Sequence, residues 1–591
     1  METNKIPGSC PQDETTLEYG RYCKDNGDYR RAAEIFKALI PLADKVAKGC
    51  LYRELAFVLE KTGRVEDAIS ALQSALEIDN NDGDALEMIG RAYRRQKDSE
   101  RALVHMTRAL EIRNGDPRSQ PSREWFFRIH GELAGIYHEK GDHQKALSAI
   151  REALRYQSHD FRAHYDIVSL LFLLDCREDA VTEIKGRIDS IGRDKSSQRS
   201  QRCRELAVLC YENGEFELAR HCLENLLDTI DENNVFERNK VFNRLEYLMG
   251  KTVIESRPLR MQICLTRKCN LNCIMCYDKY RQEWELPQKT VEEIESYFPC
   301  LEYVQWRGGE VFLYKSFREL FDKAALYPRL CQDIVTNGTL VTEEWAEKII
   351  RTGTKLSLSI DGVHKDTYEK IRRGARFEDV LRTLRMLKHY RALIQKPKFR
   401  PELFMNFVVL RSNYKDVEDI IDFAVENGIE FVQTVAGDTS DFPQTDPFKN
   451  EDIRNDAEII RYLQERLPAM HQKAKKFGVK YRNFFPDDAC SADEKVEPKV
   501  SAEPVPKRPK RPMGYCRAPW DSLFVFLFDT VKPHCFCDAV IGDIKDEKLE
   551  AMWNNPVMQQ YRKKVSGRDI TDFCSQRCRK QEPFENMGLN L

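Results

Sequence analysis

The chain has 591 residues, of which 41% are apolar and 32% are charged, with 94 Lys and Arg against 96 Asp and Glu. This length predicts several domains, each with a core of its own. The formal net charge of -2 gives no electrostatic reason to expect nucleic acid or an anionic membrane as a partner. No apolar run is long enough to cross a bilayer, and the first residues show no signal-peptide pattern. We therefore expect a soluble, cytoplasmic, multidomain protein.

The 19 cysteines are unusual for such a chain. Reducing conditions disfavour structural disulfides, so clustered cysteines in a cytoplasmic protein more often bind metal or do chemistry. The cysteines of the first 250 residues are scattered and are expected to be small buried hydrophobic residues. Two groups are clustered, at 264–276 and at 516–578, and these two groups direct the functional argument.

The first third of the chain contains a repeat. A turn residue is followed five positions later by an alanine, with a period mostly near 34 residues, at Gly27/Ala32, Gly63/Ala68, Lys97/Ala102, Gly141/Ala146, Asp175/Ala180 and Gly214/Ala219. Segments such as KTGRVEDAISALQSALEI resemble tetratricopeptide (TPR) repeats. We expect an α-solenoid over 1–250, whose concave groove binds a peptide or protein. The alternatives are a dimerisation surface or a spacer.

The pattern changes in the middle third. Short β-branched runs at MQICLT, EYVQW, DIVTN, KLSLSI, LFMNFVVL and EFVQTV alternate with helical stretches at 289–298, 316–326, 342–353, 376–391 and 413–427. This alternation predicts parallel strands with crossover helices, arranged as a partial (β/α)6 TIM-like barrel over 258–487. No G-x-G-x-x-G or Walker sequence follows these strands, so nothing supports a nucleotide-binding fold.

The first of these strands is followed by Cys269-Asn-Leu-Asn-Cys273-Ile-Met-Cys276. This spacing places three thiolates on one short loop. They can hold three irons of a [4Fe–4S] cluster, which normally takes four ligands. Cys264 lies inside the strand, so one iron is expected to stay open, as a metal centre requires if it is to bind and transform a ligand.

The C-x3-C-x2-C loop resembles that of the radical S-adenosylmethionine (radical SAM) superfamily, with Met275 in place of the aromatic residue common before the third cysteine. Three later stretches at the ends of predicted strands match as well: Arg307-Gly308-Gly309-Glu310, Thr336-Asn337-Gly338 and Ser359-Ile-Asp361-Gly362. The resemblance implies that S-adenosylmethionine is bound there, with Glu310 on the methionine ammonium group and Ser359 and Arg372 on its carboxylate. The implied cofactor-binding residues are Gly308, Gly309, Glu310, Asn337, Ser359, Asp361 and Arg372, with Asn406 and Asn413 as weaker matches.

The resemblance also implies the chemistry. A reduced cluster, supplied with electrons by a donor such as flavodoxin or ferredoxin, cleaves S-adenosylmethionine to methionine and a 5′-deoxyadenosyl radical. That radical abstracts a hydrogen atom from the substrate. The protein supplies orientation and exclusion of water.

Residues 488–514 are rich in proline and charge and are predicted to form a flexible linker. The remainder, 515–591, resembles the SPASM/twitch auxiliary-cluster domain, and its few cysteines favour the shorter, twitch-like form. The resemblance implies that Cys516, Cys535, Cys574 and Cys578 bind a second [4Fe–4S] cluster; zinc is the alternative metal for four thiolates. Cys537 is left over: it replaces Cys535 as a ligand, is inert, or donates a hydrogen atom.

Family resemblance suggests three functions. The first is a maturase that modifies a peptide or protein held by the repeats, since a binding domain fused to an active site raises the effective concentration of the substrate. The second is an oxidase or epimerase of a small or carrier-bound metabolite such as a sugar, with the repeats binding a partner protein. The third, a zinc-binding TPR scaffold, is remote because every core motif is intact. No residue pattern singles out a catalytic base.

Overall fold

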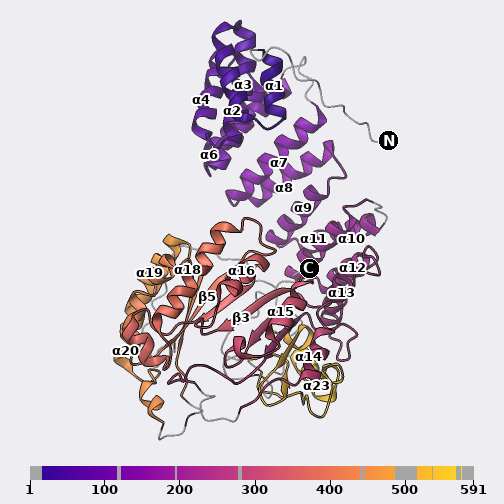
Figure 1. Cartoon of the computed structure of the whole chain (residues 1–591). Helices are drawn as coiled ribbons and strands as arrows, with labels where there is room; N and C mark the ends of the chain where they lie inside the picture. Colours follow the sequence, from indigo (N-terminus) through magenta and orange to yellow (C-terminus); the bar gives the residue numbers. More distant parts are fainter. Residues whose placement is uncertain are drawn as a thin grey trace. The chain divides into compact units, whose positions relative to one another are not determined.

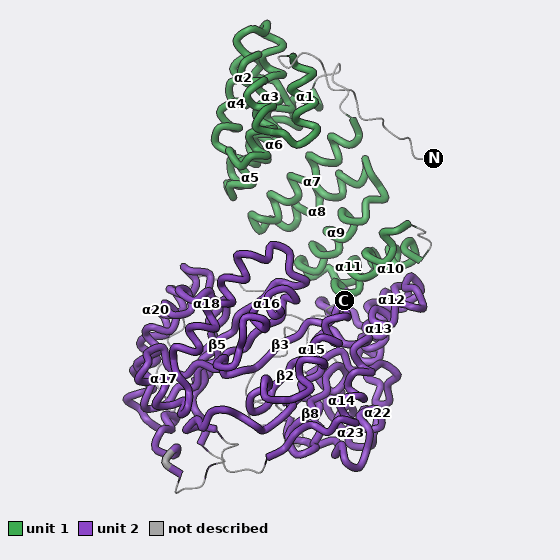
Figure 2. Tube along the Cα trace, viewed as in Figure 1, with its two compact units in different colours: residues 1–209 green, residues 210–591 purple. Residues whose placement is uncertain are grey.

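The computed structural model describes residues 16–115, 122–192, 196–276, 283–439, 442, 446–485, 516–535, 537–567 and 574. The chain forms two compact units, 1–209 and 210–591, which Figure 2 colours green and purple. The predicted linker at 488–514 lies outside the described residues. None of the described helices is both long enough and apolar enough to cross a membrane.

The first unit is a stack of helix pairs, drawn in indigo and violet in Figure 1. Its helices are α1 (Leu17–Asp25), α2 (Tyr29–Leu39), η1 (Ile40–Leu42), α3 (Lys45–Lys61), α4 (Val65–Ile78), α5 (Gly83–Arg95), α6 (Ser99–Gly115), α7 (Arg123–Glu139), α8 (His143–Tyr156), α9 (Phe161–Leu173), α10 (Arg177–Gly192) and the first part of α11 (Arg199–Glu212).

The turn and alanine positions of the predicted repeat behave as expected. Every turn residue has a positive φ, between 58° and 82°, at Gly27, Gly63, Lys97, Gly141, Asp175 and Gly214. Every paired alanine is at most 2% exposed. A left-handed residue ends the first helix of each pair, and the alanine lets the second helix pack closely against its neighbours. The helical repeat is therefore confirmed.

The first compact unit ends before residue 250, where the sequence placed the end of the repeat domain. Helices α12 (Phe216–Leu227) and α13 (Val235–Leu248) belong to the second unit, although the sequence placed the domain end at residue 250. Helix α13 buries Asn243, Arg244 and Glu246, each at most 1% exposed. These side chains bind the chain that follows α13 and the terminal domain, so α13 is covered by tertiary contacts that its repeat-like sequence does not indicate.

The second unit is built on one sheet, ordered β10-β9-β8-β1-β2-β3-β4-β5-β6-β7. Its strands are β1 (Arg260–Cys264), β2 (Tyr303–Arg307), β3 (Cys331–Thr336), β4 (Lys355–Ser359), β5 (Leu403–Val409), β6 (Phe431–Ala436), β7 (Lys480–Phe484), β8 (Ser522–Val525), β9 (Thr530–Lys532) and β10 (Gly542–Asp543). Strands β1 to β7 are parallel in chain order, which confirms the predicted parallel-strand α/β fold. Strand β7 was not predicted.

The terminal domain extends this sheet. Strand β8 pairs in parallel with β1, and β9 and β10 follow as antiparallel strands. The connecting helices are α14 (Gln288–Glu295), α15 (Phe317–Ala325), α16 (Glu343–Thr352), α17 (Lys365–Ile371), α18 (Phe377–Leu393), α19 (Ile420–Glu426) and α20 (Ala457–Phe477), with α21 (Ala518–Asp521), α22 (Leu549–Trp553) and α23 (Pro556–Ser566) in the terminal domain. Functional residues are expected where the parallel strands end.

Candidate active site

The loop that carries the first cysteine group follows β1 and is held by backbone hydrogen bonds to a loop distant in sequence. The Asn272 N–H donates to the Arg373 carbonyl (2.8 Å), and the Ile274 N–H donates to the Ile371 carbonyl (3.0 Å). Within the loop, the Cys276 N–H donates to the Cys273 carbonyl (3.2 Å). The cysteine loop is therefore fixed against the chain that follows β4.

The three cysteines lie beside other residues singled out from the sequence. Asn337 Nδ2 lies 3.9 Å from Cys269 Sγ, and Arg372 Nη1 lies 3.8 Å from Cys273 Sγ. Burial raises the pKa of Cys273 to about 11, and the Arg372 guanidinium acts in the opposite direction. The strand ends of β1, β3 and β4 thus converge on one loop of thiols.

Among the described residues, no group of three His, Cys, Asp or Glu side chains could hold a single metal ion. An iron–sulfur cubane makes a different demand, because each thiolate binds its own iron. Three thiols on one loop at C-x3-C-x2-C spacing suit such a cluster.

The glycines that follow β2 allow two loops to pack closely. Gly308 has φ +141°, and a Cβ there would lie 2.4 Å from the Thr266 carbonyl oxygen. A Cβ on Gly309 would lie 2.4 Å from the Lys268 carbonyl oxygen. The Gly309 N–H donates to Thr266 O (2.6 Å). The backbone approached by these glycines is therefore that of the cysteine loop.

Glu310 is fully buried next to this contact. Its carboxylate accepts hydrogen bonds from the Thr336 hydroxyl (2.8 Å), the Asn337 N–H (2.9 Å) and the Phe312 N–H (3.4 Å). Burial raises the pKa of Glu310, and these hydrogen bonds oppose that effect. A carboxylate can accept about four hydrogen bonds, so Glu310 keeps capacity for a ligand donor.

Asp361 and Arg372 form a buried ion pair, with Arg372 Nη2 2.5 Å from Asp361 Oδ2. Burial alone would lower the pKa of Arg372, but the Asp361 carboxylate raises it above its ordinary value. The Nε of Arg372 is buried and has no hydrogen-bond partner among the described residues. This unsatisfied donor suits a ligand carboxylate, which is the group that the sequence resemblance assigns to Arg372.

The two weaker candidates have different surroundings. Asn413 is buried, and its Nδ2 donates to the backbone oxygens of Asp361 (2.9 Å) and Val408 (2.8 Å), so it braces the ends of β4 and β5. Asn406 on β5 pairs in register with Ser359 on β4, and both residues line the cavity enclosed by the strands. Of these two weaker matches, Asn413 therefore supports the strand ends, and Asn406 lines the cavity.

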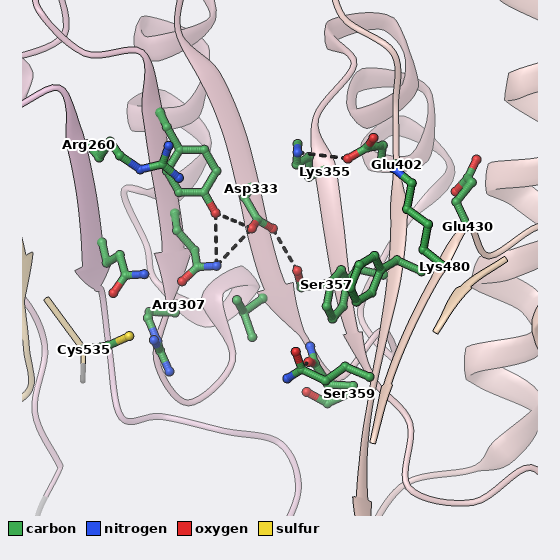
Figure 3. Close-up of a pocket in the computed structure, with 18 of the residues that line it drawn as sticks. Arg260, Arg307, Asp333, Lys355, Ser357, Ser359, Glu402, Glu430, Lys480 and Cys535 are labelled. Carbon is green, nitrogen blue, oxygen red and sulfur yellow. Dashed lines mark hydrogen bonds and ion pairs between the residues drawn. The ribbon is translucent and has the colours of Figure 1, made fainter. Parts of the chain in front are cut away.

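A cavity of about 780 Å³ occupies the space enclosed by the strands, and we call it the lumen (Figure 3). Most of its lining residues occupy alternate strand positions: Arg260, Gln262, Tyr303, Gln305, Arg307, Asp333, Val335, Lys355, Ser357, Ser359, Glu402, Phe404, Asn406, Glu430, Phe431, Gln433, Lys480, His534 and Cys535. Apart from Ser359, Asn406, Cys535 and Arg307, which begins the Arg-Gly-Gly-Glu motif, these residues were not singled out from the sequence. Polar residues at every second strand position were the signal that could have found them.

A buried hydrogen-bond network centres on Asp333 in the lumen (Figure 3). Its carboxylate accepts from Tyr303 Oη (2.6 Å), Gln305 Nε2 (2.9 Å) and Ser357 Oγ (3.0 Å). Burial raises the pKa of Asp333, and these donors act against that effect.

On the lumen wall formed by β5 and β6, the rings of Phe404 and Phe431 stack with centroids 4.1 Å apart. The lumen therefore offers both polar and aromatic contacts.

The terminal cysteines are arranged differently from the sequence prediction. Cys537 forms an isolated β-bridge with Cys574, and Tyr561 Oη lies 3.2 Å from Cys537 Sγ and 3.6 Å from Cys574 Sγ. Burial raises the pKa of Cys516, and the neighbouring thiols of Cys537 and Cys574 raise it further. These three cysteines lie together.

Cys535, which the sequence favoured as a cluster ligand over Cys537, is not brought to this group. It lines the lumen beside Gln262 and Arg307, and its Sγ lies 3.6 Å from His534 Nδ1. This placement favours the alternative in which Cys537, and not Cys535, lies with Cys516 and Cys574. Cys578 lies outside the described residues.

Family models match the chain in the same order as these features. Residues 263–424 match the radical SAM superfamily, and residues 516–579 match SPASM, an iron-sulfur cluster-binding domain. Two tetratricopeptide repeat models match residues 47–115 and 127–160. Together these matches show a radical SAM domain that follows N-terminal TPR repeats and precedes a C-terminal SPASM domain. The radical SAM domain implies a [4Fe–4S] cluster with S-adenosylmethionine, and the SPASM domain implies auxiliary iron–sulfur clusters.

Several curated proteins are similar over part of the chain. A probable GTP 3′,8-cyclase of Methanocaldococcus jannaschii is 28% identical over 36% of this chain and 72% of its own length. A serine-type anaerobic sulfatase-maturating enzyme of Bacteroides thetaiotaomicron is 32% identical over 21% of this chain and 34% of its own. An uncharacterized M. jannaschii protein is 28% identical, and the matched region spans 28% of this chain and 59% of the length of that relative.

Among solved structures, Streptococcus suis SuiB bound to S-adenosylmethionine is 15% identical, with a TM-score of 0.40, over 61% of this chain and 80% of its own. The peptide-binding TPR protein YrrB is 17% identical, with a TM-score of 0.26, over 33% of this chain and 92% of its own. Likeness at these scores supports no functional argument.

Proposed function

We propose that this enzyme generates a 5′-deoxyadenosyl radical and uses it to abstract a hydrogen atom from a peptide or protein substrate. The observation that carries the proposal is the convergence of the Cys269–Cys276 loop with Glu310 and Asn337, which follow the ends of β2 and β3, and with Arg372, which follows helix α17. In this proposal Cys269, Cys273 and Cys276 hold the cluster and leave one iron open. Such a cluster, when bound, supplies the electron that cleaves S-adenosylmethionine.

The residues around the loop would bind and orient S-adenosylmethionine. Glu310 has acceptor capacity for the ammonium group, and the unsatisfied Nε of Arg372 suits the carboxylate. Asp361 fixes the Arg372 side chain through their ion pair. Ser359 and Asn337 add polar groups from the ends of β4 and β3, and Gly308 and Gly309 let the Glu310 loop reach the cysteine loop.

The proposed substrate class rests on the repeats and on one relative. TPR solenoids offer extended concave surfaces that bind peptides and proteins. The Bacteroides relative is by its name a maturating enzyme for a sulfatase, which favours a protein substrate. In this proposal the repeats hold the substrate chain, and the lumen takes the residue to be modified. Modification of a small or carrier-bound metabolite remains the alternative if no peptide is accepted.

The terminal domain would hold an auxiliary cluster. We assign Cys516, Cys537 and Cys574 as ligands because these three thiols lie together, and Cys578 as the fourth by its place in the sequence motif. Cys535 is left out of the ligand set because it lines the lumen. Flavodoxin or ferredoxin is the proposed class of electron donor.

The proposal is tested with Cys273→Ala. The anaerobically reconstituted variant is expected to form no 5′-deoxyadenosine from S-adenosylmethionine and dithionite, because it lacks a thiolate that the proposed cluster needs. The measurement is product quantification by mass spectrometry. The matched control is Cys331→Ala, which removes a thiol at the amino end of β3, outside the residues that line the lumen. Formation of 5′-deoxyadenosine at the wild-type rate by Cys273→Ala would contradict the proposal.

A further inference from the structure

The lumen contains a thiol that the proposed cluster sites do not use. Cys535 belongs to the terminal domain, in the chain that follows β9, yet it lines the same cavity as Ser359 and Asn406 from the radical SAM domain. Ser359 and Asn406 lie in register on neighbouring strands, and Ser359 is the last residue of β4. The terminal domain therefore places a sulfur atom in the cavity where the proposed substrate binds.

Contacts with both domains fix the position of this thiol. The Gln262 side chain of β1 and the Arg307 guanidinium of β2 lie next to Cys535, and Cys535 Sγ lies 3.6 Å from His534 Nδ1. Figure 3 shows its sulfur on the Arg307 side of the lumen. Behind it, Cys535 packs against the hydrophobic cluster of Cys264, Phe524 and Leu527. Because β8 pairs directly with β1, this packing joins the two domains across one continuous sheet.

A turn separates Cys535 from Cys537. The Cys537 N–H donates to the His534 carbonyl (3.0 Å), which closes a turn that includes Cys535. In an extended strand, residues two apart would face the same side. The turn lets Cys537 face Tyr561 and Cys574, while Cys535 faces the lumen.

We propose that Cys535 is a catalytic residue that returns a hydrogen atom to the substrate radical, which makes the overall change at the reacting carbon redox-neutral. This inference rests on the proposed function. A thiol suits the role because its S–H bond is weaker than an unactivated C–H bond. The cavity brings the thiol to the space that the substrate carbon would occupy.

The proposed step balances as follows. The substrate carbon radical takes the hydrogen atom of Cys535, so a C–H bond forms, the S–H bond breaks and a thiyl radical remains. The thiyl radical is reduced by one electron from the flavodoxin- or ferredoxin-class donor that the proposed function already requires. It then takes one proton from solvent, which restores the thiol. Return of hydrogen to the opposite face of a stereocentre would invert that centre.

The first test locates the free thiol without any turnover. The anaerobically reconstituted holoenzyme is treated with iodoacetamide and digested, and fragment-ion mass spectrometry assigns the modified cysteine. Alkylation of Cys535, with Cys516, Cys537 and Cys574 protected, is the expected result. Alkylation of Cys537 with Cys535 protected would overturn the inference, because Cys535 would then be the ligand.

The second test asks whether this thiol can deliver hydrogen in the active site. The holoenzyme cleaves S-adenosylmethionine with dithionite in D2O, in a buffer free of added thiols, so that only exchangeable protein hydrogens carry deuterium. We expect deuterium in the 5′-deoxyadenosine from the wild type, and natural isotope abundance in the product from Cys535→Ser, because a hydroxyl is a poor hydrogen-atom donor. Cys331→Ser is the control and should match the wild type.

Unlabelled 5′-deoxyadenosine from the wild type, or equal labelling from Cys535→Ser, would overturn the role of Cys535. Either result still requires 5′-deoxyadenosine to form, so failure of this inference is distinguishable from failure of the proposed function. Absence of the product from wild type and variants alike would contradict both.

Discussion

At the scale of single residues, the site combines a sequence-local motif with side chains that only the fold brings to it. The three loop cysteines are separated by three and two residues and were evident from their spacing. Glu310 and Asn337 follow the ends of β2 and β3, and Arg372 follows helix α17, so residues far apart in sequence meet at one edge of the parallel sheet. The buried carboxylate of Glu310 is the residue whose role can be tested most directly.

Glu310→Gln is expected to weaken S-adenosylmethionine binding by about 10- to 100-fold, the usual cost of a hydrogen bond to a charged group. Thr336 Oγ1 and Asn337 N both donate to the Glu310 carboxylate, and the amide N–H groups of the variant cannot accept those hydrogen bonds. Isothermal titration of the reconstituted enzyme measures the effect. Glu319→Gln, on an exposed part of α15, should bind as the wild type does. Unchanged affinity in Glu310→Gln would remove this residue from the binding site.

The sequence could not identify the residues of the lumen or distinguish the two neighbouring cysteines. Asp333 and Gln305 belong to no local motif, and they become lumen residues only because the sheet curves around a cavity. Cys535 and Cys537 are only two residues apart, and the cysteine pattern favoured Cys535 as the cluster ligand. Their different surroundings depend on the turn at His534 and on contacts with β1, β2 and α23, which are remote in sequence.

At the scale of elements, periodicity predicted most of the helices and strands that build the site. The exceptions have physical causes. Strand β7 is a five-residue edge strand with only one buried residue, so its sequence carries little hydrophobic signal. Helix α13 follows the repeats in sequence, but its buried Arg244 faces Asp521 of the terminal domain. A repeat pattern gives no information about such a distant partner.

The ion pairs around Asp521 lead to a stability prediction. Burial alone would raise the pKa of Asp521, but Arg517 and Arg244 lower it below its ordinary value. A lowered pKa in the folded state stabilises the fold at neutral pH, and the effect is lost as the pH falls through that pKa. Asp521→Asn should therefore lower the unfolding free energy by about 3–5 kcal/mol at pH 7, because two buried guanidinium groups lose their partner.

Urea unfolding followed by tryptophan fluorescence measures this change, and Asp546→Asn at an exposed position is the control. The difference between Asp521→Asn and the wild type should shrink in acid. A difference that stays constant down to strongly acidic pH would show that lost packing, and not lost charge, is responsible.

At the scale of the whole molecule, the two compact units do not coincide with the division read from the sequence. The boundary near residue 209 leaves α12 and α13 with the catalytic unit. A fragment of residues 196–591 keeps α11 to α13 complete, whereas residues 251–591 lack the buried side chains of α13. We expect the first fragment to be soluble and to cleave S-adenosylmethionine without substrate at the rate of the full chain.

The second fragment should aggregate or unfold at a lower temperature, because removing α13 leaves Asp521 without Arg244 and uncovers the surface around Trp520. Soluble yield, thermal unfolding and 5′-deoxyadenosine formation are compared side by side. Equal stability of the two fragments would show that α13 is not needed by the second unit and would support a domain boundary at residue 250.

The sequence by itself determined the repeat, the order of the β/α units, the cysteine loop and the motifs at the strand ends. These features are recognisable because turn residues, periodicity and motif spacing act over short stretches of chain. The tertiary structure alone decided which helices complete the catalytic unit, which polar residues share the lumen and which terminal cysteine faces it. Those outcomes depend on contacts between residues far apart in sequence, such as β8 beside β1 and Cys535 beside Arg307, and no local pattern encodes such contacts.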